Sequence, residues 1–240
     1  MSDAKGKLYL VPTPIGNLGD ISQRALATLQ QADLVACEDT RVSGALLKRF
    51  SIQKRLISYH NFNEMGRARQ LLEELQTGKS VAVITDAGSP GISDPAYRVV
   101  RTALDHDIEI VALPGPSALI PALTASGLPT DRFFFEGFLP VKGAARRNRL
   151  KVLKSFEHTL VFYESPHRIN KAVADMHEVL GDRRACLARE ISKKFEEYLR
   201  GRLGELAEML SKRTIKGEIV LVVEGLGKGH PEAGDEEAGI

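Results

Sequence analysis

Residues 80–95 read SVAVITDAGSPGISDP, and this stretch decides how the first half of the chain is interpreted. Ser80–Thr85 is a short apolar run of the kind that forms a buried β-strand. Asp86–Gly91 contains too much glycine and proline to continue that strand. Asp94–Pro95 predicts the start of a helix, because proline is tolerated at the first helical position. The stretch therefore predicts a strand, a loop of small residues and a helix in succession.

The same succession repeats on both sides of this stretch. Other apolar runs with the length of buried strands are 7–11, 33–37, a short one near 56–57, and 108–113. Strands that alternate with helices predict the α/β class, with a mainly parallel sheet and helices on both faces. Ligands bind beyond the carboxyl ends of such strands. We therefore expect loops 12–20, 86–94 and 114–118 to converge on one edge of the sheet.

The character of the sequence changes after about residue 125. An aromatic, strand-like segment at 133–138 is followed by a basic helix at 143–156 and by further strand and helix patterns up to about 223. The chain thus predicts two α/β domains, over residues 1–126 and 127–225, with a hinge near Gly127–Thr130. Residues 226–240 are rich in Gly and Glu, which is typical of a disordered tail.

The composition limits the class of protein. The 240 residues are 43% hydrophobic and 27% charged, as in ordinary globular proteins, and a net charge of +2 excludes a histone-like polycation. No apolar run approaches the ~18 residues of a membrane span, and the N-terminus lacks the apolar region of a signal peptide. Cys37 and Cys186 are too few for a zinc cluster or a disulfide framework. We therefore expect a cytoplasmic protein with neither a membrane nor a metal as partner.

Two of the loops carry side chains suited to a small polar ligand. Asp86 stands where a strand ends, so its carboxylate suits a cation, an amine or ribose hydroxyls. Ser117 is expected at a helix N-terminus, where free amides bind polar groups. A tight turn and a helix cap are the plainer explanations of these residues. The patterns G-x-G-x-x-G and G-x-x-x-x-G-K-[ST] are absent from the sequence, so neither a dinucleotide fingerprint nor a Walker A loop is supported.

Other polar clusters also follow predicted strands. Cys37–Arg41 has two acids, a hydroxyl and an arginine, and Tyr59–Glu64 offers His60 as a base or substrate contact. Phe162–Arg168 and Arg189–Lys194 have the same position in the second half. Helix capping and solvated faces explain these clusters without a function.

A basic run lies between Glu136 and Glu157, with no acid inside it. A phosphate backbone is a natural partner for such a run, although many charge runs are solvated helix faces. Its six cations are Lys142, Arg146, Arg147, Arg149, Lys151 and Lys154.

Taken together and in order, these segments resemble the tetrapyrrole methylase superfamily. The segments that carry the resemblance are 9–18, 37–41, 85–95, 114–118, 162–168 and 188–190. Within the superfamily the chain is most similar to the branch that methylates the 2′-hydroxyl of a cytidine in the decoding region of 16S ribosomal RNA. The resemblance implies two α/β domains of the class III methyltransferase type, S-adenosylmethionine in the cleft between them, and a homodimer.

The resemblance also implies roles for individual residues. Relatives often carry Gly-Asp-Pro where this chain has Gly88-Ser89-Pro90, so Asp86 is expected to take over the role of that acid. The cofactor contacts carried over by position are Pro12, Asp86, Gly88, Ser89, Ile92, Ser117, Ala118, Tyr163, Glu164 and Gly217. The candidates for orienting or accepting the hydroxyl proton are His60, Glu38, Asp39 and Lys193. The candidates for RNA binding are Arg41, Asn61, Arg146, Arg147, Arg149 and Lys151. No metal is required.

From the residues alone, three other functions stay open. A methylase of a tetrapyrrole or another small molecule would share the cofactor loops without needing the basic helix. A non-catalytic RNA-binding or ribosome-assembly module would need that helix but neither Asp86 nor Ser117. A nicotinamide-dependent oxidoreductase would need the glycine fingerprint that the sequence lacks.

Overall fold

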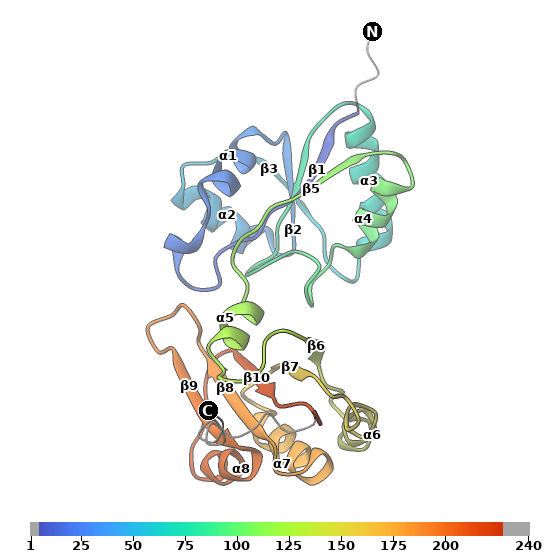
Figure 1. Cartoon of the computed structure of the whole chain (residues 1–240). Helices are drawn as coiled ribbons and strands as arrows, with labels where there is room; N and C mark the ends of the chain where they lie inside the picture. The colour runs from blue at the N-terminus through green and yellow to red at the C-terminus, as the bar shows by residue number, and fades with distance from the viewer. Residues whose placement is uncertain (1–4, 228–240) are drawn as a thin grey trace, which may run out of the picture. The chain divides into compact units, whose positions relative to one another are not determined.

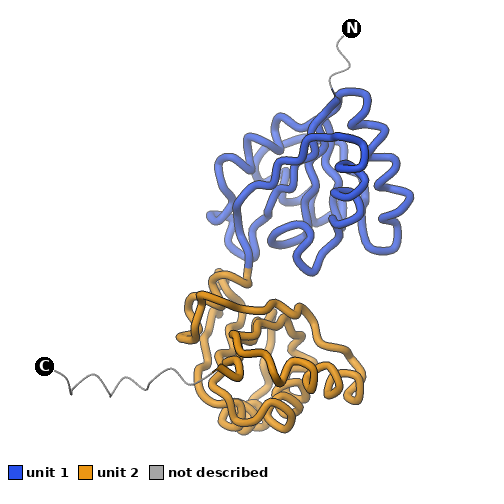
Figure 2. The backbone as a smooth tube through the Cα atoms, turned by 45° about the vertical axis from the view of Figure 1, so that its right-hand side comes forward, with its two compact units in different colours: residues 1–117 blue, residues 118–240 orange. Residues whose placement is uncertain are grey.

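The computed structural model describes residues 5–227 (Figure 1). The chain divides into two compact units, residues 1–117 and 118–240 (Figure 2). The division precedes helix α5, Leu119–Thr124, whereas the sequence suggests a domain boundary after residue 126. Of the tail expected to be disordered, residues 228–240 lie outside the described residues.

The first unit is built on a five-stranded parallel sheet. Its strands are β1 Lys7–Leu10, β2 Leu34–Cys37, β3 Arg55–Ser58, β4 Val81–Val83 and β5 Glu109–Ala112. They lie in the order β3-β2-β4-β1-β5, and every neighbouring pair is parallel. This arrangement confirms the parallel sheet that the alternating strand and helix signals predict.

Helices cover both faces of this sheet, as predicted (Figure 1). The helices are η1 Leu18–Asp20, α1 Gln23–Gln31, α2 Thr40–Arg49, α3 Glu64–Gln76 and α4 Tyr97–Leu104. Successive strand residues point to opposite faces, so Leu34 packs in the core under α3 and α4. Its neighbour Val35 packs in the core under α1 and α2. All four residues of β2 are buried for this reason, which is why the strand reads as a continuous apolar run.

One helix begins later than the sequence suggests. The expected start at Asp94–Pro95 is wrong, because α4 begins at Tyr97. Residues 91–95 form turns and bends instead, with Gly91 at φ 84° and Ser93 at φ 63°. Both values are left-handed, so the backbone cannot enter a right-handed helix at this point.

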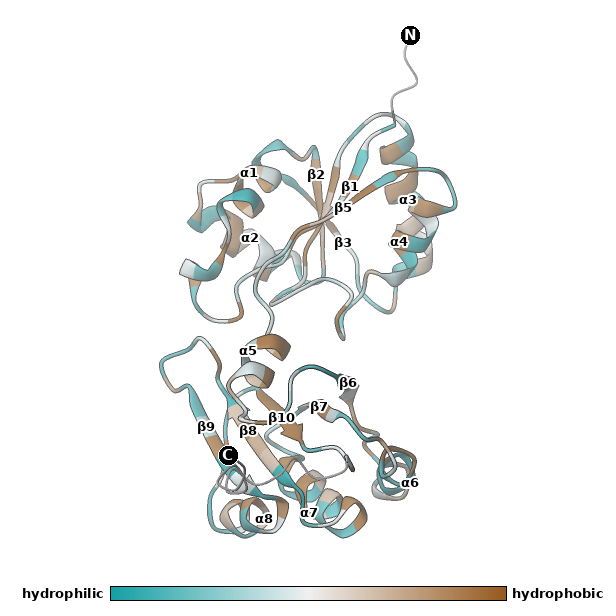
Figure 3. Ribbon diagram, viewed as in Figure 1, coloured by the Kyte–Doolittle hydropathy of each residue, from teal (hydrophilic) through white to brown (hydrophobic). Residues whose placement is uncertain are grey.

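The second unit is built on a mixed sheet. Its strands are β6 Phe133–Phe138, β7 Thr159–Glu164, β8 Arg184–Arg189, β9 Glu197–Arg202 and β10 Ile219–Val223, in the order β6-β7-β10-β8-β9. β6 and β7 are parallel, and the other neighbours are antiparallel. Helices α6 Gly143–Leu153, α7 Ile169–Leu180 and α8 Leu203–Lys212 supply the core of one face. The hydrophobic β10 lies at the centre of this sheet (Figure 3).

Within residues 5–227, no helix has both the length and the apolar character that crossing a bilayer requires. In the same range, His, Cys, Asp and Glu side chains do not gather in threes in a way that would hold a metal ion.

Candidate functional site

Two loops of the first unit are joined beyond the carboxyl ends of β1 and β4. Thr13 and Gly88 exchange two backbone hydrogen bonds, of 2.9 and 3.0 Å. The Thr13 hydroxyl donates to the carbonyl of Thr85 at 3.0 Å, and it is buried there. Gly88 has a φ of 88°, which side chains rarely allow, so this turn requires glycine.

The loop after β5 joins the same edge. Ser89 Oγ donates to the carbonyl of Pro116 at 3.0 Å. A Cβ added to Gly115 would lie 2.7 Å from Cβ of Pro12, so Gly115 allows the first and third loops to touch. The prediction that loops 12–20, 86–94 and 114–118 converge is therefore confirmed by their contacts. Within this edge, Pro12 is buried and supports the loops, whereas Ile92 is 39% exposed and available to a ligand.

Acidic side chains gather on this edge of the first unit. The amide of Asp39 donates to Asp86 Oδ1 at 3.2 Å, which links the loops after β2 and β4. Burial raises the pKa of Asp94 to about 7, with further contributions from the charges of Glu38 and Asp86. Burial and Asp86 also raise the pKa of Glu38, while His60 opposes the shift. The edge therefore has a negative potential, which suits a cation or hydroxyl donors.

Asp39 differs from the other acids because it is already paired. Its Oδ1 accepts from the Arg41 amide at 2.8 Å and caps α2, and its Oδ2 lies 2.6 Å from Arg41 Nη2. Hydrogen bonds from the Arg41 side chain and backbone lower the pKa of Asp39 to about 2. Asp39 is thus a weak base, while most of the Arg41 side chain remains exposed.

His60 lies in the loop after β3, beside its own turn. Its Nε2 is 3.1 Å from Nδ2 of Asn63, and because an amide nitrogen can only donate, Nε2 is assigned as the acceptor. Its Nδ1 is buried and has no hydrogen-bond partner within residues 5–227. The lone pair that a general base needs is therefore engaged by Asn63. The neighbouring Asn61 is exposed.

Tyr59 ties the loop that carries His60 to the start of α4. It is buried, its hydroxyl donates to Glu64 Oε1 at 3.1 Å, and the same oxygen accepts from the Val99 amide at 3.2 Å. Glu64 also lies 3.2 Å from Nε of Arg98. Burial and the nearby Glu64 raise the pKa of this phenol, so it stays protonated.

Ser117 and Ala118 stand at the division between the two units. Ser117 lies at the N-terminus of α5, immediately before its N-cap Ala118, so the plainer explanation of Ser117 as the helix cap is wrong. The backbone ladder of α5 begins with the bond from the Ala122 amide to the Ala118 carbonyl, one residue beyond Ser117.

Tyr163 and Glu164 end β7 in the second unit. Tyr163 packs edge-on against Phe135 and Phe138, with ring centroids 4.9 and 5.8 Å away. Glu164 is 4% exposed, and its Oε1 accepts from the Ser165 amide at 2.7 Å and lies 2.6 Å from Arg168 Nη2. These contacts give both residues a structural role within the unit.

Gly217 and Lys193 meet at Glu190. Gly217 has a φ of 90°, and a Cβ added there would lie 2.3 Å from Cδ of Glu190, so the Glu190 side chain fills that space. Lys193 Nζ lies 3.0 Å from Glu190 and 2.9 Å from Glu218. Burial would lower the pKa of Lys193, but hydrogen bonds to Glu218 and Glu190 raise it. Lys193 therefore stays protonated at neutral pH and cannot accept a proton.

The basic helix α6 is largely engaged inside its own unit. Arg146 is 5% exposed and pairs with Asp175 at 2.6 Å, and Arg147 reaches the same carboxylate at 3.1 Å. Arg149 forms a two-pronged pair with Glu136, with both distances 2.6 Å. Lys151 is exposed, and the side chain of Arg147 is 43% exposed. Arg146 thus joins α6 to α7, and a phosphate cannot reach it in this arrangement.

The comparison with family models matches residues 7–207 to the Tetrapyrrole (Corrin/Porphyrin) Methylases. The chain belongs to the tetrapyrrole methylase family.

Two relatives of this tetrapyrrole methylase bear the same name, ribosomal RNA small subunit methyltransferase I. The Mesorhizobium japonicum protein is 53% identical over 218 residues, which cover 90% of this chain and 74% of the relative. The Escherichia coli protein is 49% identical over 226 residues, covering 93% and 79%. A solved structure of uroporphyrin-III C-methyl transferase from Thermus thermophilus, complexed with S-adenyl homocysteine, matches with a TM-score of 0.62 at 22% identity, covering 91% and 97%. This last likeness concerns the fold, and it confirms the α/β class predicted for this chain.

The sequence interpretation missed Asp94 as a member of the acidic group. Its place before Pro95 suggests a helix cap, and that interpretation does not reveal that the half-buried carboxyl lies within electrostatic reach of Glu38 and Asp86. The sequence does contain a signal for an acidic group at this edge. Acidic residues follow both β2 and β4, and these two strands are neighbours in the sheet.

Proposed function

We propose that this chain transfers the methyl group of S-adenosylmethionine to the ribose 2′-hydroxyl of a cytidine in the decoding region of small-subunit ribosomal RNA. The observation that carries the proposal is the 49–53% identity, over at least 90% of the chain, to proteins named ribosomal RNA small subunit methyltransferase I. The six ordered sequence segments described above favour the cytidine 2′-hydroxyl as the acceptor.

The first unit offers groups that fit the cofactor. S-adenosylmethionine supplies an activated methyl group on a positively charged sulfonium, together with ribose hydroxyls and an amine. The carboxylate of Asp86 provides negative charge beyond the end of β4, and the carboxyl of Asp94, whose pKa is raised to about 7, is close enough to feel that charge. The left-handed turns at Gly88 and Gly91 hold the loop between them in a shape that side chains at these positions would disfavour. Asp86, Ser89 and Ile92 are the residues of this loop that we assign to cofactor binding.

Among the four candidates for the proton of the 2′-hydroxyl, Glu38 is best suited. Asp39 is weakly basic because of Arg41, Lys193 is protonated, and the Nε2 lone pair of His60 is engaged. Glu38 is partly buried, and its raised pKa makes it a stronger base than an ordinary carboxylate. In the transfer, the bond between methyl carbon and sulfur breaks as the bond to the ribose oxygen forms. Glu38 receives the hydroxyl proton, and the sulfur keeps the electron pair of the broken bond.

Three exposed cations are suited to bind the phosphates of the RNA. Arg41 lies two residues beyond Asp39 and directs most of its side chain to solvent. Lys151 and the exposed part of Arg147 lie on α6. We assign these three to RNA phosphates and assign Arg146 and Arg149 to the support of α6.

The proposal also includes a homodimeric assembly and a cytoplasmic location. The resemblance favours a homodimer, and light scattering of the purified chain measures it directly. A ribosomal substrate favours the cytoplasm, where small subunits are assembled and used.

The test combines binding with transfer. Titration calorimetry should show binding of S-adenosylmethionine and no heat from NAD. Labelled methyl groups should then pass to the RNA of purified small ribosomal subunits, and nuclease digestion should recover the label on a cytidine ribose. Binding without transfer to RNA, combined with transfer to a tetrapyrrole, would assign the chain to small-molecule methylation instead.

A further inference from the structure

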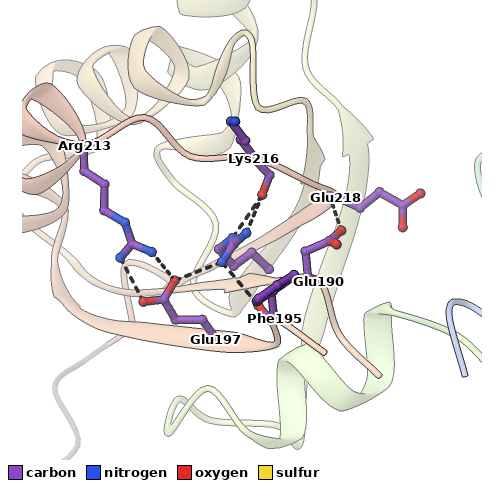
Figure 4. Close-up of polar contacts among 7 residues, drawn as sticks. Glu190, Phe195, Glu197, Arg213, Lys216 and Glu218 are labelled. Atoms are coloured by element: carbon purple, nitrogen blue, oxygen red, sulfur yellow. Dashed lines mark hydrogen bonds and ion pairs between the residues drawn. The ribbon is translucent and has the colours of Figure 1, made fainter. Parts of the chain in front are cut away.

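The connection between β8 and β9, residues 190–196, is fixed by polar bonds at both ends; we refer to it as the β8–β9 loop. Arg189, at the end of β8, donates to the carbonyl of Phe195 at 3.2 Å and to that of Lys216 at 2.9 and 3.0 Å (Figure 4). Glu197, at the start of β9, lies 3.3 Å from Arg189 Nη1 and accepts both prongs of Arg213 at 2.7 and 2.8 Å. The two strand ends are therefore locked to the segment that precedes β10.

The path of the backbone between these ends is unusual. Glu190 and Ser192 have left-handed φ values of 51° and 68°, although neither is glycine. Three contacts hold this path: Glu190 packs over Gly217, its Oε1 accepts from the Glu218 amide at 3.0 Å, and Glu196 accepts from the Ser192 amide at 2.6 Å. A left-handed conformation of a residue other than glycine persists only where surrounding contacts hold it in place. Such conformations are common in functional loops.

Some charged side chains around the β8–β9 loop form ion pairs, and others do not. Lys193 pairs with Glu190 and Glu218, and Arg213 pairs with Glu197. Within residues 5–227, Lys194 and Lys216 have no acidic partner at ion-pair distance. Lys194 Nζ instead lies 5.6 Å from the ring centroid of Phe195, and Phe195 is 64% exposed. The β8–β9 loop thus presents an exposed aromatic ring with the unpaired cation of Lys194 beside it, on a backbone held by hydrogen bonds.

We propose that the β8–β9 loop is an RNA contact, in which Phe195 stacks on an unpaired base and Lys194 binds an adjacent phosphate. Stacking on aromatic side chains together with basic groups along the backbone is how proteins hold single-stranded RNA. The locked backbone reduces the entropy lost on binding. The proposal rests on the proposed function, which supplies RNA as the substrate.

A second protein copy fits this surface less well. A stable protein interface needs about 800 Å² from each partner, with an apolar centre and few lysines. Here the exposed ring of Phe195 stands beside the Lys194 ammonium, and Lys193 and Arg213 are already paired with acids.

The experiment measures fluorescence anisotropy of the full chain with a short single-stranded RNA that contains cytidines and with a duplex of equal length. We expect Phe195→Leu to weaken single-strand binding about five-fold or more and to leave duplex binding nearly unchanged, because only unpaired bases stack. Phe195→Tyr should retain the affinity. Lys194→Ala should reduce the slope of log affinity against log salt by about one. Lys48→Ala removes an exposed lysine of α2 as the matched control and should change neither quantity.

Several results would overturn the proposal. Unchanged affinity of Phe195→Leu, or equal losses for both RNA forms, would rule out stacking. A change in oligomeric state on light scattering would assign the loop to a contact between copies. Failure of this inference is separate from failure of the proposed function: methyl transfer by the wild-type chain would stand even if Phe195→Leu bound RNA normally. Equal thermal melting of the variants excludes misfolding, and Lys194→Ala alters only an exposed side chain.

Discussion

The amide of Asp39 donates a 3.2 Å hydrogen bond to the carboxylate of Asp86, and this bond joins the loops that follow two neighbouring strands of the first sheet. Asp86 itself is exposed and therefore keeps its second oxygen available to a ligand. Because Asp86 orders this edge and is assigned to the cofactor in our proposal, its function should be sensitive to small changes of its side chain.

We expect Asp86→Ala to weaken S-adenosylmethionine binding by about ten-fold or more, since a hydrogen bond to a charged group is worth about 1.5–3 kcal/mol. Asp86→Asn keeps the hydrogen-bond acceptor without the charge and should lose less. Titration calorimetry measures both, with Asp105→Ala, in an exposed pair on α4's C-terminal side, as the control. Wild-type affinity in Asp86→Ala would remove Asp86 from the site.

Asp94 should make the stability depend on pH. Its pKa is raised from 3.8 to about 7 in the folded chain, so between these values the unfolded chain is ionised there while the folded chain is still protonated. Stability contributed by Asp94 therefore falls as pH rises from about 4 to about 7 and stays low above that.

Asp94→Asn removes this dependence. The melting temperature of the variant minus that of the wild type should increase as the pH rises from about 4 to about 7. Above pH 7 this difference should be constant. Thermal melting at a series of pH values is the measurement. A difference that does not vary with pH would contradict the assignment of a half-buried Asp94 that stays protonated up to about pH 7.

Glu38→Gln should slow methyl transfer about a hundred-fold while leaving S-adenosylmethionine affinity nearly unchanged, because a positioned base typically contributes 10²–10⁴-fold. The wild-type rate should rise with pH as Glu38 ionises, at a pH above the usual range for a glutamate, because burial raises its pKa. The rate of Glu38→Gln should not show this rise with pH. An unchanged profile would move the role of the base to another residue.

Arg146→Met should destabilise the chain by about 3 kcal/mol, because it leaves Asp175 buried with only the partly exposed Arg147 as a partner. Urea unfolding measures this loss. Arg147→Ala should cost much less stability and should weaken RNA binding. The double change Arg146→Met with Asp175→Leu should restore most of the stability, and a failure to do so would mean that the ion pair is not the cause.

The strands and the meeting of the loops could be predicted from the sequence because they depend on local patterns. A buried parallel strand such as β2 is apolar throughout, and glycine and proline end it. Parallel strands then bring the loops at their carboxyl ends to one edge without any need to know the tertiary contacts.

The role of the basic helix could not be predicted in the same way. Arg146 and Asp175 are 29 residues apart, and the sequence gives no sign that α6 and α7 place them in contact. From the sequence, a run of cations therefore indicates a phosphate-binding surface. In the structure, one of these cations, Arg146, joins two helices instead. Lys193 illustrates the same limit, because its partner Glu218 lies 25 residues away on another segment.

The shared phenol of Tyr59 has a mechanical consequence. One oxygen atom serves Glu64, which begins α3, and Val99, in the first turn of α4. Pulling the His60 loop outward would break the bond that anchors the first turn of α4, and the reverse is equally true. Displacement of either segment would therefore release the other from this contact.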